Sequence, residues 1–243
     1  MPDIYSSTGD GRIASHVANS GATWADSRDA TSGTSVVTNE SSSDDFVSVS
    51  RFGARGGSNT YKVQRTFLVF DVSSITGTVA DVELKIHGDG GNDGSIWGVK
   101  GLNFIGSLAV GSFDGIVGYS AGNQMFGNVT QYTEINTGGG NWSISGYNSL
   151  TGTSDLRDDI ESENTITIVM TDYLYDARNL APTSNGTFNC GGFYTDNTGT
   201  SKDPYLSIRL AGYGHDVNTV VAASIGKVNT VATANIGKII TVD

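Results

Sequence analysis

The histidine and cysteine side chains are too scattered to predict a metal site. His16, His87 and His215 stand far apart, and no cysteine or spaced acidic residue accompanies them in the pattern that Zn²⁺ sites need. Cys190 is the single cysteine, so it cannot form an internal disulfide, and the two glycines after it favour a small buried residue over a nucleophile. We therefore expect no metal ion, no cofactor and no thiol chemistry.

The carboxylates do not predict a catalytic pair. Glycosidases need two acidic side chains that face each other across a cleft. Here the acidic groups are Asp44 with Asp45, the run from Asp158 to Glu163, and Asp71. We interpret these groups as a turn, a helix face and a strand-end cap, respectively. The sequence therefore predicts no catalytic residues and a protein that is not an enzyme.

Two features could hold a ligand. The segment Asp89–Gly94 has the oxygen ligands and the flexibility of a calcium loop, but it lacks the spaced acidic residues of an EF-hand, so we favour a hairpin turn. Five aromatic residues could stack on sugars if they were exposed, although buried anchors under long loops are the favoured interpretation: Trp97, Tyr119, Tyr132, Trp142 and Tyr147.

The composition indicates an all-β chain with many turns. Of 243 residues, 33 are Gly, 3 are Pro and 16% are charged, against roughly 25% charged in an average domain. Ser, Thr and Asn suit turns and exposed strand faces. The net charge of −11 would repel a phosphate backbone or an anionic membrane, so we expect neither nucleic acid nor a membrane as a partner. The N-terminus lacks the features of a signal peptide, which predicts synthesis and folding in a cytoplasm.

Alternating apolar and polar residues predict strands with one buried face. Val82, Leu84 and Ile86 alternate with polar neighbours, whereas the nearly apolar Arg65–Val72 indicates a central strand. Further strands are expected at Val36–Val37, Phe46–Phe52, Ser95–Val99, Asn103–Val110, Thr165–Thr171, Phe188–Tyr194 and Tyr205–Leu210. We expect an edge strand near Gly11–Val17, an ordered loop around Trp24, a loop over Gly88–Gly94 and one short helix at Thr153–Glu161, capped by Thr153 or Ser154.

These elements predict an all-β fold, an antiparallel β-sandwich or jelly roll with one short helix and a C-terminal β-repeat tail. The jelly roll would span residues 1–213, including an N-terminal strand and loop over 1–60. The tail would span 214–243.

The tail carries the most specific pattern in the chain. Val217–Lys227 and Val228–Lys238 share eight of eleven aligned residues, and a truncated third copy begins at Ile239. One such unit cannot bury its own apolar side chains, so stacked neighbours are needed. A helical tail is disfavoured by its Val, Thr, Gly and Asn, and a tail without a role is the alternative. We predict assembly contacts at Val217, Val220, Ile225, Val228, Val231, Ile236 and Ile239.

Three stretches resemble the DNRLRE-type jelly-roll family. They are Gln64–Ile75 with Val79–Ile86, then Ser154–Ile160, and finally Gly192–Leu210. Members of that family occur as carbohydrate-binding modules on secreted enzymes and as surface proteins of phages. The tail resembles the short I-x-K-V-N-G-V repeats of tailed-phage virion proteins, with Thr230 in place of the usual Gly.

The resemblance implies a bacteriophage structural protein on the virion surface. A capsid decoration (cement) or head-fibre protein is the first expectation, and a tail-fibre component is the next. Its partners would be major capsid or tail proteins and copies of itself in a homotrimer, with a host surface glycan as a further candidate. The alternative is a carbohydrate-binding module of an extracellular polysaccharide-active system.

Overall fold

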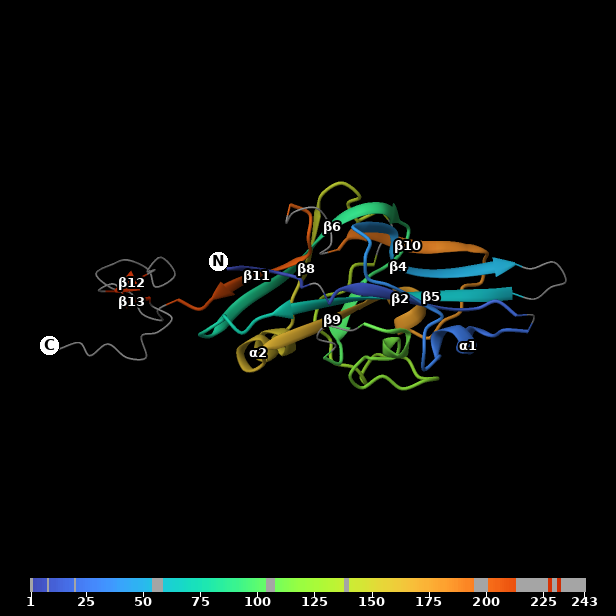
Figure 1. The fold of residues 1–243 in the computed structure, drawn as a ribbon, viewed down its shortest axis with the longest axis horizontal. Helices are drawn as coiled ribbons and strands as arrows, with labels where there is room; N and C mark the ends of the chain where they lie inside the picture. The colour runs from blue at the N-terminus through green and yellow to red at the C-terminus, as the bar shows by residue number, and fades with distance from the viewer. Residues whose placement is uncertain are drawn as a thin grey trace.

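Antiparallel strand pairing organises the molecule in the computed structural model (Figure 1). The structure describes residues 2–7, 9–19, 21–53, 59–103, 108–137, 140–194 and 201–212, together with 227–228 and 231–232. The antiparallel β-sandwich with a short helix that the sequence predicts is confirmed.

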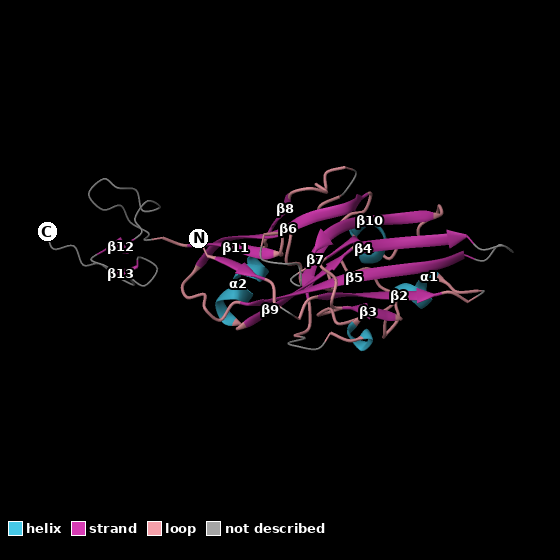
Figure 2. Cartoon of the chain, turned by 45° about the horizontal axis from the view of Figure 1, so that its top comes forward, coloured by secondary structure: helices cyan, strands magenta, loops and turns pink. Residues whose placement is uncertain are grey.

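One hydrogen-bonded path runs through eight strands, and part of it is visible in Figure 2. Its order is β1 (Asp3–Tyr5), β11 (Tyr205–Leu210), β6 (Val79–Asn92), β10 (Gly186–Phe193), β4 (Ser42–Gly53), β5 (Asn59–Asp71), β2 (Gly11–Val17) and β3 (Ser35–Val37). Three strands pair with members of this path or with each other: β8 (Tyr147–Thr151) with β6, β9 (Thr165–Thr171) with β5, and β7 (Trp97–Lys100) with β9.

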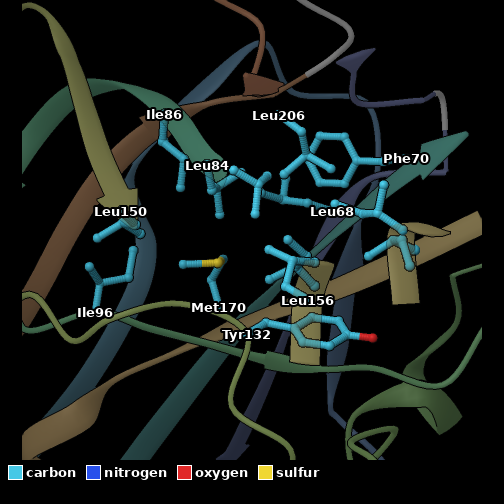
Figure 3. Packing of buried hydrophobic residues seen from close by; sticks show 14 of the residues in the cluster. Leu68, Phe70, Leu84, Ile86, Ile96, Tyr132, Leu150, Leu156, Met170 and Leu206 are labelled. Carbon is cyan, nitrogen blue, oxygen red and sulfur yellow. The ribbon is translucent and has the colours of Figure 1, made fainter. Parts of the chain in front are cut away.

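Two hydrophobic clusters lie on opposite faces of β5 and β9. The first contains Leu68 and Phe70 of β5, and the inward faces of β6, β8 and β11 cover it (Figure 3). The second contains Phe67 of β5 and Val169 of β9 and includes residues of the long connection between β7 and β8. Because both faces are covered, β5 is buried without interruption from Val63 to Phe70, and the prediction of a central strand there is confirmed.

The short helices are capped by their own sequence. Helix α2 (Ser154–Ser162) begins after Thr153, whose hydroxyl accepts a hydrogen bond from the Leu156 amide, as the sequence predicts. Helix α1 (Trp24–Arg28) lies where an ordered loop is expected, so that prediction is wrong. A capping box between Thr23 and Asp26 stabilises this single turn, which is too short to show an apolar period. A 3₁₀ turn at Val110–Ser112 and a π turn at Tyr173–Ala177 complete the helical elements in the described ranges.

Two further expectations are wrong, and half of a third lies outside the described residues. The strand β2 is not an edge strand, because it pairs with both β3 and β5. The expected loop over Gly88–Gly94 is largely the continuation of β6, which runs to Asn92 and pairs with β10. Of the strand expected over Asn103–Val110, residues 104–107 lie outside the described part and Val110 starts the 3₁₀ turn.

Close backbone approach explains the glycines in β6 and β10. The pairing of these strands shifts register between Cys190 and Gly192. A Cβ atom on Gly191 would lie 1.4 Å from the carbonyl oxygen of Asp89, and one on Gly88 would lie 1.7 Å from that of Ser143. Glycine is needed at these positions because a side chain would not fit, although a glycine-rich sequence of this kind resembles that of a loop.

We predict that Gly191→Ala destabilises the fold by about 1–3 kcal/mol or more, because the new methyl group overlaps backbone that cannot move away freely. Gly111→Ala is the matched control, since nothing lies within 4 Å of its added Cβ. Urea unfolding of both variants measures the difference. Equal stabilities would contradict the packing argument.

Candidate functional site

Most of the predicted assembly residues lie outside the described part of the chain: Val217, Val220, Ile225, Ile236 and Ile239. The two others lie in two short paired strands. The strands β12 (Lys227–Val228) and β13 (Val231–Ala232) pair antiparallel, with Val228 opposite Val231. The role of the tail in assembly stays a prediction.

Three of the five aromatic candidates are buried anchors, as the favoured interpretation predicts. Trp97 and Trp142 are each 1% exposed, and the ring nitrogen of Trp142 donates to the Gly191 carbonyl over 2.8 Å. Tyr132 is equally buried, and its hydroxyl donates to Asp159 on α2. None of these three rings can stack on a sugar. Tyr119 is half-buried, whereas Tyr147 is 36% exposed.

The exposed Tyr147 belongs to a regular face of the sandwich, formed by β1, β11, β6 and β8. Alternation turns Leu206, Leu84 and Leu150 into the core, so the residues between them point outward. The strand register aligns these outward residues in a row: Tyr5, Tyr205, Lys85 and Ser149. In the next row His87 lies opposite Tyr147. We call this surface the outer face.

Aromatic rings form a continuous contact series across the outer face. Ring centroids are 5.3 Å apart for Tyr5 and Tyr205, 5.2 Å for Tyr205 and Tyr147, 5.2 Å for Tyr147 and His87, and 5.1 Å for His87 and Phe193. Lys202 places its ammonium 4.4 Å from the Phe193 centroid. Tyr5 is 40% exposed. Burial, followed by the neighbouring Tyr205, Tyr5 and Asp203, raises the pKa of Tyr147 to about 12, so its hydroxyl remains a donor at neutral pH.

A polar hollow adjoins this aromatic series along β8. Its volume is about 220 Å³, and the outward residues Ser149 and Thr151 of β8 help to line it. The remaining lining residues come from β8 and the segments before it: Leu150, Glu134, Ile135, Asn136, Thr137 and Asn141. Amide, hydroxyl and carboxylate groups thus lie beside a row of rings, an arrangement suited to binding a ligand with both polar and flat apolar surfaces.

The described residues contain no group of three or more His, Cys, Asp or Glu side chains able to hold a metal ion. Sequence reasoning expects no Gly-x-Ser-x-Gly motif, which is wrong at the level of sequence because one occurs at Gly118–Gly122. This motif lies in a loop and not in the sharp turn between a strand and a helix that a nucleophile elbow occupies. The Ser120 hydroxyl accepts a hydrogen bond from the side-chain amide of Asn123.

Cys190 is the small buried residue that the sequence predicts. It is 1% exposed, and burial raises the pKa of its thiol to about 12. Among the carboxylates, Asp71 caps the end of β5 by accepting from the amide and hydroxyl of Ser73, as expected. Asp44 and Asp45 lie within β4 rather than in a turn, which corrects that expectation. No helix within the described ranges is long and apolar enough to cross a bilayer.

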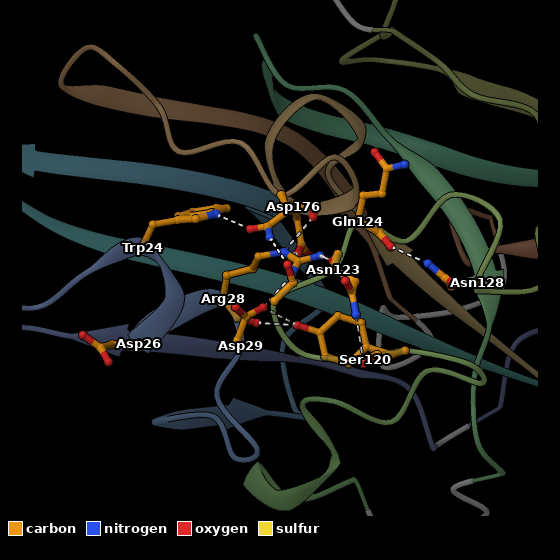
Figure 4. Close-up of polar contacts among 12 residues, drawn as sticks. Trp24, Asp26, Arg28, Asp29, Ser120, Asn123, Gln124, Asn128 and Asp176 are labelled. Atoms are coloured by element: carbon orange, nitrogen blue, oxygen red, sulfur yellow. Dashed lines mark hydrogen bonds and ion pairs between the residues drawn. The ribbon is translucent and has the colours of Figure 1, made fainter.

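A buried ion cluster holds the segments beneath the sheet together (Figure 4). Arg65 of β5 donates from Nε and Nη2 to both carboxylate oxygens of Asp176, over 2.7 and 2.8 Å. Arg28 of α1 donates to the Asp176 carbonyl over 2.9 Å and to the Asn123 carbonyl over 2.8 Å. The side chains of Arg28, Arg65 and Asp176 are fully buried. Phe113 presents its ring 4.3 Å from the Arg65 guanidinium.

Burial and neighbouring groups set the pKa of two carboxylates at the π turn, Asp172 and Asp176. Burial alone would raise the pKa of Asp176, but Arg65 and Arg28 lower it overall, so Asp176 is ionised. Asp172 accepts from the amides of Tyr175 and Ser95 and from the Ser95 hydroxyl. Burial nevertheless outweighs these bonds and raises the pKa of Asp172 to about 6.

The sequence matches no protein-family model and no curated protein. The resemblance to the DNRLRE-type family therefore remains a prediction. Sequence reasoning identified Tyr147 but missed Tyr5, Tyr205 and Phe193. The alternation of Tyr205, Ser207 and Arg209 with apolar residues could have predicted an outward face. The sequence does not specify which strands pair, so the contacts between the rings could not be predicted.

We predict that Asp176→Asn lowers the free energy of unfolding by about 3–5 kcal/mol, since the buried Arg65 loses its counter-charge and Arg28 keeps only its ion pair with Asp29. The matched control is Asp158→Asn on the exposed face of α2, expected to stay within about 0.5 kcal/mol of the unmodified protein. Denaturant unfolding provides both values. A small effect of Asp176→Asn would show that the cluster is not needed for stability.

Asp172 should make stability fall as pH rises from about 4 to about 6. In this window the unfolded carboxyl has lost its proton, because its pKa is 3.8, while the folded one still holds it. Asp172→Asn should make the slope of unfolding free energy against pH less negative than in the unmodified protein. An unchanged slope would argue against the raised pKa.

Proposed function

We propose that the chain is a non-enzymatic structural protein of a bacteriophage particle. A capsid decoration (cement) or head-fibre protein is the first assignment, and a tail-fibre component is the second. The observation that carries this proposal is the eleven-residue repeat after the last strand of the sandwich, where Val217–Lys227 and Val228–Lys238 share eight residues. Repeats of this size bury their apolar side chains only against neighbours.

The strand order favours a role as a projecting or covering module. β11 is the last strand of the sandwich, and it pairs with β1 on one side and β6 on the other. The amide of Ile208 also donates to the carbonyl of Pro2 over 3.1 Å. The repeat thus leaves from a firmly paired strand. In our proposal the repeat docks on major capsid or tail proteins, or joins copies of the chain into a homotrimer, while the sandwich faces outward.

The second candidate function is a carbohydrate-binding module of an extracellular polysaccharide-active system. The observation that favours it is the outer face, with its contiguous rings and adjoining polar hollow. Trp97 and Trp142 do not contribute, because both are buried. The two functions differ in the part that they require: assembly needs the repeat, whereas sugar binding needs the sandwich.

We predict that deletion of Val217–Asp243 leaves a folded monomer that no longer assembles, because the sandwich keeps its own hydrophobic clusters. Sedimentation velocity measures the oligomeric state, and circular dichroism checks the fold. Replacing Val220, Ile225, Val231 and Ile236 by Asn in the full chain should have the same effect, whereas Thr219→Ser with Thr230→Ser should not. Oligomers or particle binding that survive the deletion would reject the assembly role.

A further inference from the structure

We propose that the outer face and the hollow beside β8 form one binding site for an uncharged oligosaccharide. This inference gives the second candidate function a site and a ligand class, and it holds equally for a protein mounted on a particle. It does not depend on the repeat. The argument rests on the rings, the lining of the hollow and the charge of the surface.

The rings supply the apolar half of the site. Tyr5 and Tyr147 are 40% and 36% exposed, although most aromatic residues of the described chain are buried or partly buried. A pyranose presents a flat C–H face that stacks on such rings while its hydroxyl groups remain in water. Successive centroids from Tyr5 through Tyr205 to Tyr147 are 5.3 and 5.2 Å apart, so the three rings lie side by side over more than the width of one sugar ring. That extent suits a short sugar chain rather than a single unit.

The hollow supplies the polar half. Ser149 and Thr151 point outward from β8, on the same side of the sheet as Tyr147, so the hollow continues the ring series. A volume of about 220 Å³ lies below the roughly 300–1,000 Å³ of pockets for drug-sized ligands and suits one sugar unit. Hydroxyl and amide groups form much of its lining and match the alternating donors and acceptors of a sugar ring.

The charges of the surface indicate an uncharged ligand. Lys85 lies 2.6 Å from the Glu83 carboxylate, so it is already paired. Lys202 lies over Phe193 at one end of the ring series. Glu134 adds a negative charge to the hollow, and the whole chain carries −11. An acidic polysaccharide would meet net repulsion, whereas a neutral one would not.

A protein partner fits the same surface less well. The residues that dominate protein–protein binding sit in well-packed, desolvated pockets near the centre of an interface. The hollow here has a polar lining of Ser, Thr, Asn and Glu at the side of the rings. An uncharged sugar chain uses both parts of the site, whereas an apolar protein anchor would leave these polar groups without water or partner.

The test is isothermal titration of the full chain with neutral hexasaccharides of β-1,4-linked glucose, xylose, mannose and N-acetylglucosamine and of α-1,4-linked glucose, with a heparin hexasaccharide as the anionic probe. At least one neutral probe should bind, and heparin should not. Tyr5→Ala and Tyr147→Ala should each weaken binding about tenfold, the scale of one aromatic contact. Phe52→Ala is the matched control, because this ring is 42% exposed on β4 beside His16, away from the outer face.

Tyr147→Phe separates stacking from local folding. The Tyr147 hydroxyl lies 3.2 Å from the carbonyls of Ser201 and Asp203, so its loss tests that anchor while the ring remains. Binding should persist in Tyr147→Phe and in the chain lacking Val217–Asp243, which keeps this test distinct from that of assembly. The proposal is overturned if no neutral probe binds at millimolar concentration, if heparin binds better, or if Phe52→Ala weakens binding as much as Tyr147→Ala. Loss of an oligomer in Tyr147→Ala without a change in sugar binding would overturn it too, in favour of a protein interface.

Discussion

The bidentate ion pair between Arg65 and Asp176 is the constraint on which the segments around the second hydrophobic cluster depend. Both groups are fully buried, and burying either one alone would be unfavourable by several kcal/mol. The pair forms only if α1, β5, the segment near Phe113 and the π turn all reach their places, because each supplies an atom of the cluster. A region with few regular elements is thereby held in one arrangement against the second hydrophobic cluster.

The outer face lies over the other hydrophobic cluster, away from the ion cluster. The outer face is built entirely on β1, β11, β6 and β8, whose inward residues pack on the first hydrophobic cluster. Strand pairing therefore sets the positions of its side chains, and the Tyr147 hydroxyl is held in addition by the carbonyls of Ser201 and Asp203. Rings on paired strands lose little freedom when a partner arrives, which favours binding because the ordering has occurred during folding.

The sequence predicted the parts of this structure that obey a local period. Thr165–Thr171 and Tyr205–Leu210 were predicted with the bounds observed, and α2 with its Thr153 cap, because alternation and capping are encoded by neighbours. The prediction of a loop at Gly88–Gly94 was wrong because glycines that allow close backbone packing cannot be told from turn glycines by sequence alone. The ion cluster and the outer face could not be predicted, since Arg65 meets Asp176 and Tyr5 meets Tyr205 through pairings that no local pattern specifies.

The position of β11 between two partners determines how the sandwich responds to tension. A pull transmitted from the chain beyond Leu210 acts along the axis of β11, and the hydrogen bonds to β1 and β6 lie across that axis. The load is then shared by the whole ladder as shear, instead of opening the bonds one after another as in peeling. A domain tethered through this strand is mechanically robust in the direction in which its attachment would be stretched.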